Sequence, residues 1–465
     1  MASQPAFARF VPPVPPPPIG ELSTLRFVAA MRVNAIGGWP EAAYRERVLS
    51  RRVLGRTRIT VSDPGAVRRV LVDRTETYVR TAITIRLLRP MLGDGLLISE
   101  SGSWRHQRRT LAPAFAPRAV EALIPPIAAA TNEVLPALAA AASEGPIDLF
   151  AALQRLTLEI AGRTMFSLGM AHHGERLRGF VERYSTRHAA PRLLDALLPR
   201  WLPSPHDLGR ARFRRAWVRF LDEVVAERAA GRSIENGDRN GGGPDKGDLL
   251  DRLRDARDPD TGQGFTPEDL RDQVATLMLA GHETTAVTLL WTCTLLALMP
   301  DVQDAVAREV RAAGIGAEPL RGLPLTRAVV EETMRLYPPA FAISRQAVAE
   351  DMLADAPVAP GDIVLIAPWL LHRHRGLWRD PDAFDPGRFL PGAPPPPRYA
   401  YLPFGAGPRI CIGAGFALSE AVVILARLVA AFRFARADDR PVLPMGVITT
   451  QPDHAPAFLL KARGA

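Results

Sequence analysis

Apolar residues recur along most of the chain three and four positions apart, the spacing that places side chains on one face of an α-helix. This spacing predicts helices over residues 40–54, 64–72, 104–111, 119–142, 149–166 and 208–230. Short apolar runs typical of β-strands occur at residues 58–61, 342–348, 363–366 and 457–460. The pattern therefore predicts a mainly α fold with a small β portion.

The longest predicted helix begins after Thr266 and ends before Pro300. Thr266 is a good N-cap residue, and Pro267 suits the first helical position. Thirty-odd residues would span roughly 45–50 Å at a rise of about 1.5 Å per residue, enough to cross a domain. Because polar residues at 282–285 interrupt its apolar run, we expect a buried core helix here and not a membrane span.

Two segments depart from the helical pattern. Residues 12–18 are nearly all proline and predict an extended, semi-rigid strap over residues 1–20. Residues 231–247 are rich in glycine, asparagine and aspartate and predict a mobile surface loop. This loop is too short to separate two large domains, so residues 21–465 are predicted to form a single domain.

The composition, 47% hydrophobic and 23% charged, is that of a protein with a large packed core. The first residues contain no apolar targeting segment, and we expect a soluble, cytoplasmic protein without a membrane anchor. Its two cysteines, Cys293 and Cys411, exclude a disulfide scaffold and fit a reducing compartment.

The formal net charge is +9, and almost all basic residues are arginine. A GC-rich genome explains this bias as well as attraction to an acidic partner does, and both explanations stay open. A short Lys/Arg block with interleaved aromatic residues is missing from the sequence, so nucleic acid is not an expected partner.

Cys411 lies in the segment Phe404–Gly413, just ahead of an apolar helix predicted over residues 414–432. Two glycines and a proline before the cysteine predict a tight turn, with the thiol close to a helix N-terminus. The helix dipole and free amide groups there favour a thiolate, the form in which cysteine binds iron. A buried structural cysteine would explain the thiol, but not the phenylalanine, glycines and arginine around it.

This loop resembles the haem-binding signature of the cytochrome P450 family, Phe-x-x-Gly-x-Arg-x-Cys-x-Gly, at every fixed position. The resemblance implies the cytochrome P450 fold, with haem b (iron protoporphyrin IX) between a long central helix and the Cys-loop helix. It implies that Cys411 is the ligand to the iron, that Phe404 packs beside its sulfur, and that Arg409 contacts a haem propionate. A thiolate ligand favours cleavage of the O–O bond.

Glu332 and Arg335 are three residues apart on a predicted helix and share one face. Alone, this spacing indicates a surface ion pair of little energetic value. With Tyr337-Pro338-Pro339 after it, the pair resembles the Glu-x-x-Arg helix of the family. Arg388, within residues 384–389, resembles the third member of that group, although Gly387 stands where Glu is more usual. The resemblance implies a buried, structural charge network that fixes the Cys loop.

Trp104 and Arg108 are four residues apart on a predicted helix and also share a face. An exposed basic helix is the plain alternative. The Trp-x-x-x-Arg pattern resembles the pair that binds haem propionates in the family, and Arg345 resembles a third propionate contact. His106 is a weaker candidate for the same role.

Residues 280–285, Ala-Gly-His-Glu-Thr-Thr, lie midway along the long helix and resemble the oxygen-activating segment of the family. Gly281 would let the helix widen and admit dioxygen, the expected co-substrate, or water. The resemblance implies that Glu283 relays protons from solvent and that Thr284 offers a hydroxyl beside the iron, which makes both catalytic. The alternative is a threonine that bonds back to its own helix. Cys293 is predicted to serve packing alone.

The resemblance places the roof of the substrate pocket in a loop over residues 81–97. The lining residues it implies are apolar: Ile83, Ile85, Leu87, Leu88, Met91, Leu92, Ala280, Phe341, Ala342, Ile343 and Ile448. We therefore expect an apolar small-molecule substrate, such as a fatty acid or a terpenoid. Arg86 is expected to be solvated, with pairing to a substrate carboxylate as the alternative.

The sequence contains no recognisable flavin or iron–sulfur segment, so a monooxygenase of this kind would take electrons from separate proteins. We expect a ferredoxin or flavodoxin with its reductase, drawing indirectly on NAD(P)H. Its acidic face is expected to dock near Arg105, Arg109 and Arg398. Two other functions stay open: a peroxide-driven peroxygenase, although such members of the family tend to lose the acid–alcohol pair, and a non-catalytic haem sensor.

Overall fold

The computed structural model describes residues 7–53, 55–166, 170, 173–188, 195, 198, 202–229, 249–314 and 322–464. Contacts divide the chain into two compact units. Unit 1 comprises Met1–Val79, Thr131–Leu153 and Thr284–Ala465, and unit 2 comprises Arg80–Ala130 and Gln154–Glu283. The single domain over residues 21–465 stays a prediction. The loop predicted at residues 231–247 lies outside the described residues.

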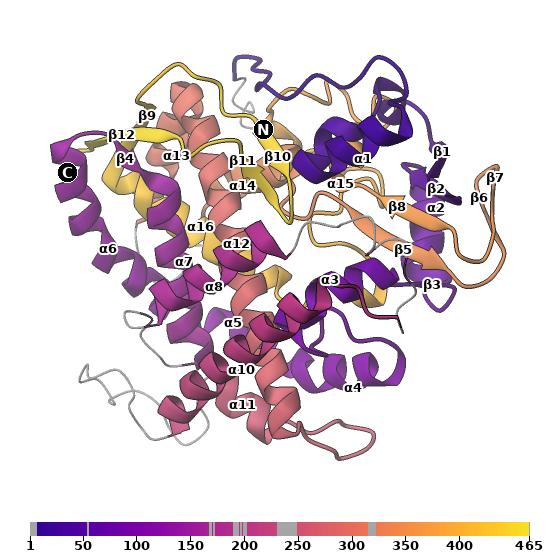
Figure 1. Cartoon of the computed structure of the whole chain (residues 1–465). Helices are drawn as coiled ribbons and strands as arrows, with labels where there is room; N and C mark the ends of the chain where they lie inside the picture. The colour runs from indigo at the N-terminus through magenta and orange to yellow at the C-terminus, as the bar shows by residue number, and fades with distance from the viewer. Residues whose placement is uncertain are drawn as a thin grey trace. The chain divides into compact units, whose positions relative to one another are not determined.

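Unit 1 contains all the described strands, whose order along the chain can be followed by colour in Figure 1. They are β1 (Val48–Val53), β2 (Arg56–Val61), β3 (Tyr78–Val79), β4 (Ile147–Asp148), β5 (Ile343–Ala347), β6 (Asp351–Leu353), β7 (Ala356–Val358), β8 (Ile363–Ile366), β9 (Phe432–Arg436), β10 (Pro444–Gly446), β11 (Thr450–Pro452) and β12 (Ala457–Ala462). Its helices are α1 (Thr24–Val33), α2 (Pro64–Arg68), α13 (Pro300–Ala313), α14 (Pro324–Leu336), α15 (Pro368–Leu371) and α16 (Ala414–Ala431).

The described residues of unit 2 form helices and connecting loops, and no strand lies among them. It contains α3 (Ala82–Leu92), α4 (Ser101–Leu111), α5 (Pro117–Glu121), α8 (Gly174–Arg187), α10 (Asp207–Ala229) and α11 (Leu249–Asp255). Three helices contribute residues to both units: α6 (Ile124–Glu144), α7 (Leu149–Phe166) and α12 (Pro267–Leu298). A mainly α fold with a small β portion is therefore confirmed, as are the helices predicted at 64–72, 104–111, 119–142, 149–166, 208–230 and 414–432.

The largest sheet has the strand order β1-β2-β8-β5-β3. Strands β2 and β8 are parallel, and the other neighbouring pairs are antiparallel. All four predicted strands are confirmed, since they correspond to β2, β5, β8 and β12. The helix predicted over residues 40–54 is wrong, because residues 48–53 form β1. Pairing of this edge strand with β2 overrides a helical spacing of apolar residues.

Helix α12 is confirmed, with 32 residues from Pro267 to Leu298. The Thr266 hydroxyl caps it by accepting a hydrogen bond from the Asp269 N–H at 3.1 Å. Residues 272–278 and 285–296 are all buried, as expected for a core helix. The helix is continuous through Gly281; that this glycine lets the helix widen stays a prediction.

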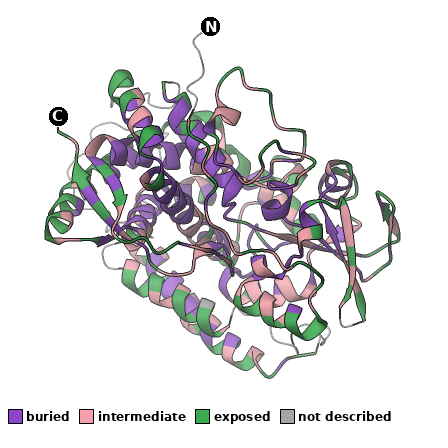
Figure 2. Ribbon diagram, turned by 90° about the horizontal axis from the view of Figure 1, so that it is seen from above, coloured by how far each residue is buried: buried purple, intermediate pink, exposed green. Residues whose placement is uncertain are grey.

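In helix α16 every residue from Ser419 to Val429 is buried; Figure 2 colours the buried residues of the protein purple. By length and composition, α16 and the stretch Pro117–Glu144 are each apolar enough to cross a membrane. The α12–α13 pair, bent by 113°, also passes if it is counted as one span. The absence of a membrane anchor stays a prediction.

In unit 2, part of the segment expected to form a loop over residues 81–97 is instead helix α3, with the Thr81 side chain as its N-cap. The Trp217 Nε1–H of α10 donates to the Met91 carbonyl at 2.7 Å, and the Tyr184 hydroxyl of α8 donates to the Leu87 carbonyl. These bonds fix α3 against α8 and α10, which local sequence could not indicate.

Arg86 of α3 is also not solvated, contrary to expectation. Its side chain is 7% exposed and donates hydrogen bonds to the carbonyl oxygens of Asp195, Leu198 and Leu202. A guanidinium group has five N–H donors, so it can satisfy several carbonyl groups at once. Arg86 therefore serves to hold the chain between α8 and α10.

The proline-rich segment is extended and is held at both ends within unit 1. The Phe384 N–H donates to the Phe10 carbonyl at 2.9 Å, and the Glu41 N–H donates to the Pro18 carbonyl at 3.0 Å. Proline lacks an N–H group, so its backbone cannot donate a hydrogen bond. A proline-rich segment is therefore held by hydrogen bonds that its carbonyl groups accept and by those of the residues beside it.

Candidate active site

The Cys411 loop turns through two residues with left-handed backbone, Gly405 and Gly407, whose φ angles are 74° and 71°. A Cβ atom at residue 407 would lie 2.0 Å from the carbonyl oxygen of Leu71. No side chain fits there without movement of the backbone. The Cys411 N–H donates to the Phe404 carbonyl at 2.9 Å, which closes the loop.

The Cys411 thiol is exposed, and α16 begins three residues later at Ala414. Phe404 and Arg409, from the same loop, are half-buried. Cys293 is the opposite case: it is fully buried, and burial raises the pKa of its thiol to about 12. An accessible thiol near the positive end of a helix fits an iron ligand, whereas the buried thiol of Cys293 does not.

Glu332 and Arg335 form a completely buried ion pair on α14. Arg335 Nε and Nη2 each lie 2.7 Å from a carboxylate oxygen of Glu332. Arg335 also donates to the carbonyl oxygens of His372 and Ala383, both at 2.8 Å. Arg388 Nε lies 3.4 Å from Glu332. The three predicted members of the charge network are therefore together, in unit 1.

His372 connects this network to the Cys loop, and sequence analysis did not find it. Its Nε2 accepts a hydrogen bond of 2.7 Å from the Leu402 N–H, two residues before Phe404. Its Nδ1 lies 3.1 Å from the Arg335 carbonyl oxygen and donates to it. Burial, helped by the positive charge of Arg335, lowers the pKa of His372 to about 3. The ring is therefore neutral and bridges two backbone segments.

The predicted catalytic residues, Glu283 and Thr284, are both half-buried on α12. Glu283 is the last residue of the unit 2 segment and Thr284 the first of the following unit 1 segment. The Thr284 carbonyl accepts a hydrogen bond of 2.9 Å from the Thr288 hydroxyl. Ala280, one turn earlier, is exposed, although residues 272–278 are buried. One side of α12 is thus accessible at the predicted oxygen-activating segment.

Glu420 is a second residue that the sequence did not indicate. It lies on α16, is buried, and accepts a hydrogen bond of 3.0 Å from the Thr285 hydroxyl of α12. This contact ties the helix that follows Cys411 to the helix that carries Thr284.

Trp104 and Arg108 are half-buried on α4, in unit 2. Their neighbours are engaged elsewhere. His106 Nδ1 lies 2.9 Å from the Asp258 carboxylate, and Arg109 lies 2.8 Å from the same group and 2.5 Å from Asp260. The prediction that Arg109 offers its charge to a partner is therefore wrong, because two carboxylates already neutralise it. His106 is likewise committed to Asp258.

Arg345 lies on β5, opposite Val364 of β8, and is buried. Its Nη1 donates to the Ser344 carbonyl at 2.9 Å. Among the residues predicted to line the pocket, Ile85, Met91, Leu92 and Phe341 are buried, and Ile448 is 40% exposed.

Unit 1 therefore holds Cys411, Phe404, Arg409, Arg345 and Thr284, and unit 2 holds Trp104, Arg108 and Glu283. The side chains in unit 1 fit a haem: an accessible thiol for the iron and arginines for the propionates. The roles implied for individual residues stay predictions.

Comparisons with known proteins give matches over most of the chain. The family model described as Cytochrome P450 matches residues 42–455. Cyclooctatin synthase of Streptomyces melanosporofaciens is 34% identical, with 80% of this chain and 79% of the relative covered. Cyclooctat-9-en-7-ol 5-monooxygenase of the same organism is 33% identical, with 74% and 73% covered. Leukotriene-B4 omega-hydroxylase 3 of Mus musculus is 30% identical, with 87% and 79% covered.

Proposed function

Because this chain belongs to the cytochrome P450 family and is a cytochrome P450 monooxygenase, we propose that it inserts one oxygen atom from O2 into an apolar organic molecule, using electrons from separate redox proteins. The observation that carries this proposal is the exposed Cys411 thiol, held in a glycine-shaped loop ahead of α16. The buried Glu332–Arg335 pair, acting through His372, keeps that loop in place.

The cofactor in this proposal is haem b, with Cys411 as its axial ligand. When bound, the haem activates dioxygen, and a thiolate ligand favours cleavage of the O–O bond. Arg345 and Arg409 would bind the haem propionates, because planar guanidinium groups pair well with carboxylates; the same role for Trp104 and Arg108 stays a prediction.

Proton supply is assigned to Glu283 and Thr284. The Thr284 hydroxyl would donate a proton within the site, and the half-buried Glu283 carboxylate would exchange protons with solvent. Glu420 takes no part in this transfer: it accepts the hydrogen bond of Thr285 and so keeps α12 packed on α16.

The proposed substrate is a fatty acid, a terpenoid or a similar hydrocarbon-rich molecule. Support comes from the predicted lining residues on α3, all of which are apolar: Ile83, Ile85, Leu87, Leu88, Met91 and Leu92. Two similar proteins are named for action on cyclooctat-9-en-7-ol and on leukotriene B4.

We propose that a ferredoxin or flavodoxin, reduced by its reductase at the expense of NAD(P)H, supplies the electrons, and that the enzyme is cytoplasmic. With Arg109 set aside, this docking is proposed to use Arg105 and Arg398. Both are exposed, and the Arg398 guanidinium lies 5.1 Å from the centre of the Tyr399 ring. Exposed charges of this kind act mainly on the association rate.

The test uses the haem-loaded protein. Its reduced carbonyl complex should show the strongly red-shifted Soret band of thiolate ligation, Cys411→Ser should lose that band, and Cys293→Ser should keep it. Soret titration with fatty acids and terpenoids should then find ligands that displace the iron's water. If product forms with hydrogen peroxide but never with reduced redox proteins, the protein is a peroxygenase and not a monooxygenase. If Cys293→Ser loses the band and Cys411→Ser keeps it, the assignment of Cys411 as the iron ligand is wrong.

A further inference from the structure

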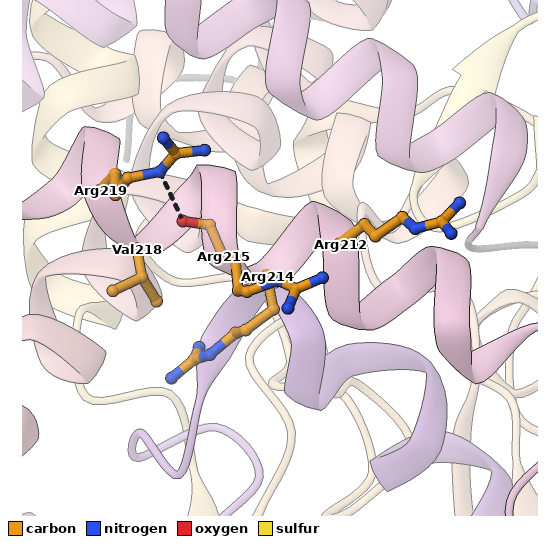
Figure 3. Close-up of a pocket in the computed structure, with 5 residues that line it drawn as sticks. All are labelled: Arg212, Arg214, Arg215, Val218 and Arg219. Carbon is orange, nitrogen blue, oxygen red and sulfur yellow. Dashed lines mark hydrogen bonds between the residues drawn. The ribbon is translucent and has the colours of Figure 1, made fainter.

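Helix α10 carries a row of exposed arginines on one face: Arg212, Arg215 and Arg219. Residues three and four apart on a helix are neighbours, so these three side chains form a line along the helix. In the part of the chain that the structure describes, no carboxylate lies within ion-pair distance of any of them. With Arg214 and Val218, they line a surface hollow, and all five side chains come from α10 (Figure 3).

Two other arginines of the same helix, Arg210 and Arg214, are paired. Arg210 lies 2.7 Å from Asp195 and 2.9 Å from Asp207, and Arg214 lies 2.9 Å from Asp272. The acidic residues at the far end of α10 are also engaged: Asp222 with Arg271 at 3.5 Å, and Glu223 with Arg176 at 2.7 Å. Among the side chains of α10 that the structure describes, the positive charge of the outward row is therefore left without an ion-pair partner.

Repulsion between the neighbouring arginines of the row destabilises helix α10. Like charges on neighbouring positions of a helix destabilise it, and the row contains two such pairs, Arg212 with Arg215 and Arg215 with Arg219. The Arg219 Nε–H makes only a long contact of 3.4 Å with the Arg215 carbonyl (Figure 3). An external anion would relieve this repulsion.

We propose that the arginine row of α10 docks an acidic helix of a partner protein, which presents carboxylates at positions i, i+3 and i+7. From Arg212 to Arg219 the row extends about 10 Å along the helix axis. Carboxylates at i, i+3 and i+7 of a second helix have the same spacing, so each arginine can pair with one carboxylate. Arginine suits this role because its planar donors match a carboxylate. Beside the row, the exposed Ala211 and the half-buried Val218 offer a narrow apolar strip for the partner.

An anionic membrane fits this surface less well. A helix that binds a bilayer surface buries a broad apolar face. Among the described residues of α10, one large apolar side chain is exposed: Leu208, at 70%. It lies in the first turn of the helix. This docking surface goes beyond the monooxygenase activity and does not depend on it.

The test uses the full-length, haem-loaded protein and two fluorescent, alanine-based helical peptides of identical composition. One carries glutamates at i, i+3 and i+7, and the other carries the same glutamates spread around the helix. At low salt the matched peptide should bind at least about fivefold more tightly, as measured by fluorescence anisotropy. The triple variant R212Q/R215Q/R219Q should weaken that binding at least about tenfold, and raising the salt to about 0.15 M should weaken it too.

The matched control is R26Q/R308Q/R311Q, which removes three exposed arginines from α1 and α13 and lowers the net charge equally. It should bind the matched peptide as the wild type does, and an unchanged Soret spectrum would confirm that both variants are folded. Equal binding of the two peptides, or an equal loss in both triple variants, would overturn the proposal. A third outcome would also overturn it: neither peptide binds, but the protein is retained on phosphatidylglycerol vesicles and the triple variant of the α10 row is not. The occupant of the row would then be a lipid surface.

Discussion

The Thr285 hydroxyl on α12 donates a hydrogen bond of 3.0 Å to the Glu420 carboxyl group on α16, and both residues are buried. Burial raises the pKa of Glu420 to about 8, so the acid is mostly neutral at pH 7. A neutral acid can accept this hydrogen bond in the core without the cost of a buried charge. The contact therefore makes the packing of two functional helices sensitive to alkaline pH.

Replacement of Glu420 by glutamine should remove this sensitivity. The folded protein keeps a proton on Glu420 that the unfolded chain releases near pH 4.5. The stabilisation linked to this proton is therefore complete below pH 4.5 and is lost as pH rises through about 8, on the order of 5 kcal/mol in full. Urea unfolding between pH 5 and 9 should show a steeper decline for the wild type than for Glu420→Gln. Parallel profiles would contradict the buried neutral acid.

His372 predicts the opposite pH dependence. Its pKa falls from 6.5 to about 3 on folding, so its contribution is complete above pH 6.5 and is lost as pH falls toward 3. His372→Gln should flatten the loss of stability between pH 6.5 and 4. The variant should also release haem faster at pH 7, because glutamine lacks the rigid ring that joins the Leu402 N–H to the Arg335 carbonyl oxygen. An acid profile equal to that of the wild type would show that His372 is not buried as a neutral ring.

Removal of Arg335 should be severe. Arg335→Ala strands the buried Glu332 carboxylate and frees three backbone carbonyl oxygens, and breaking a buried pair typically costs about 3–5 kcal/mol. We expect mostly haem-free or misfolded protein, measured by the ratio of haem to protein after purification. Arg327→Ala is the control on the same helix: its pair with Glu331 is on the surface, and such a pair is worth about 0–1 kcal/mol. A fully haem-loaded Arg335→Ala with wild-type thermal stability would refute this structural role.

Thr284→Ala should uncouple electron consumption from product formation. The variant should still bind substrate, but without the hydroxyl it should divert reducing equivalents into peroxide. The measurement is product formed per NAD(P)H consumed. Thr288→Ala, which removes a hydroxyl bonded to the Thr284 carbonyl, should stay coupled. Wild-type coupling in Thr284→Ala with a good substrate would end the proton-supply assignment.

Gly407→Ala should disable the Cys loop. The new Cβ would lie 2.0 Å from a backbone atom, the Leu71 carbonyl oxygen, so the loop must move; we expect a loss of at least about 3 kcal/mol and of most bound haem. Gly392→Ala is the matched control, because Gly392 has a similar φ of 86° and open space around its Cα. That variant should lose roughly 1–2 kcal/mol from backbone strain alone and should keep its haem. Equal thermal unfolding of the two variants would show that the contact with Leu71 is not tight.

Local sequence was sufficient for the parts of the molecule whose chemistry is local. The N-cap of α12 and the Cys411 loop each follow from a short run of residues, and the Glu332–Arg335 pair follows from its spacing on one helix. The helix predicted at residues 40–54 was wrong because the structure of this segment depends on a distant contact. Strand β1 forms because it pairs with β2, and the spacing of apolar residues along the chain contains no information about a partner strand.

Long-range contacts account for the residues that were missed or misjudged. His372 and Glu420 lack any motif, and their roles arise from Leu402 and Thr285, which are distant in sequence. Arg109 and Arg86 looked like free charges, because Asp258 and the carbonyl groups that bind them belong to other parts of the chain. Burial of a charge is decided by packing, and packing is not a local property of the sequence.

The approach of Gly407 to Leu71 also sets an order of events in the making of the protein. Leu71 leaves the ribosome long before Gly407, so the Cys411 loop cannot take its final shape until both of these distant segments have been synthesised. Bringing such distant segments together costs loop-closure entropy and slows folding. Capture of the cofactor is therefore a late step, and a nascent chain that stalls before Gly407 holds no haem, however well its earlier helices have formed.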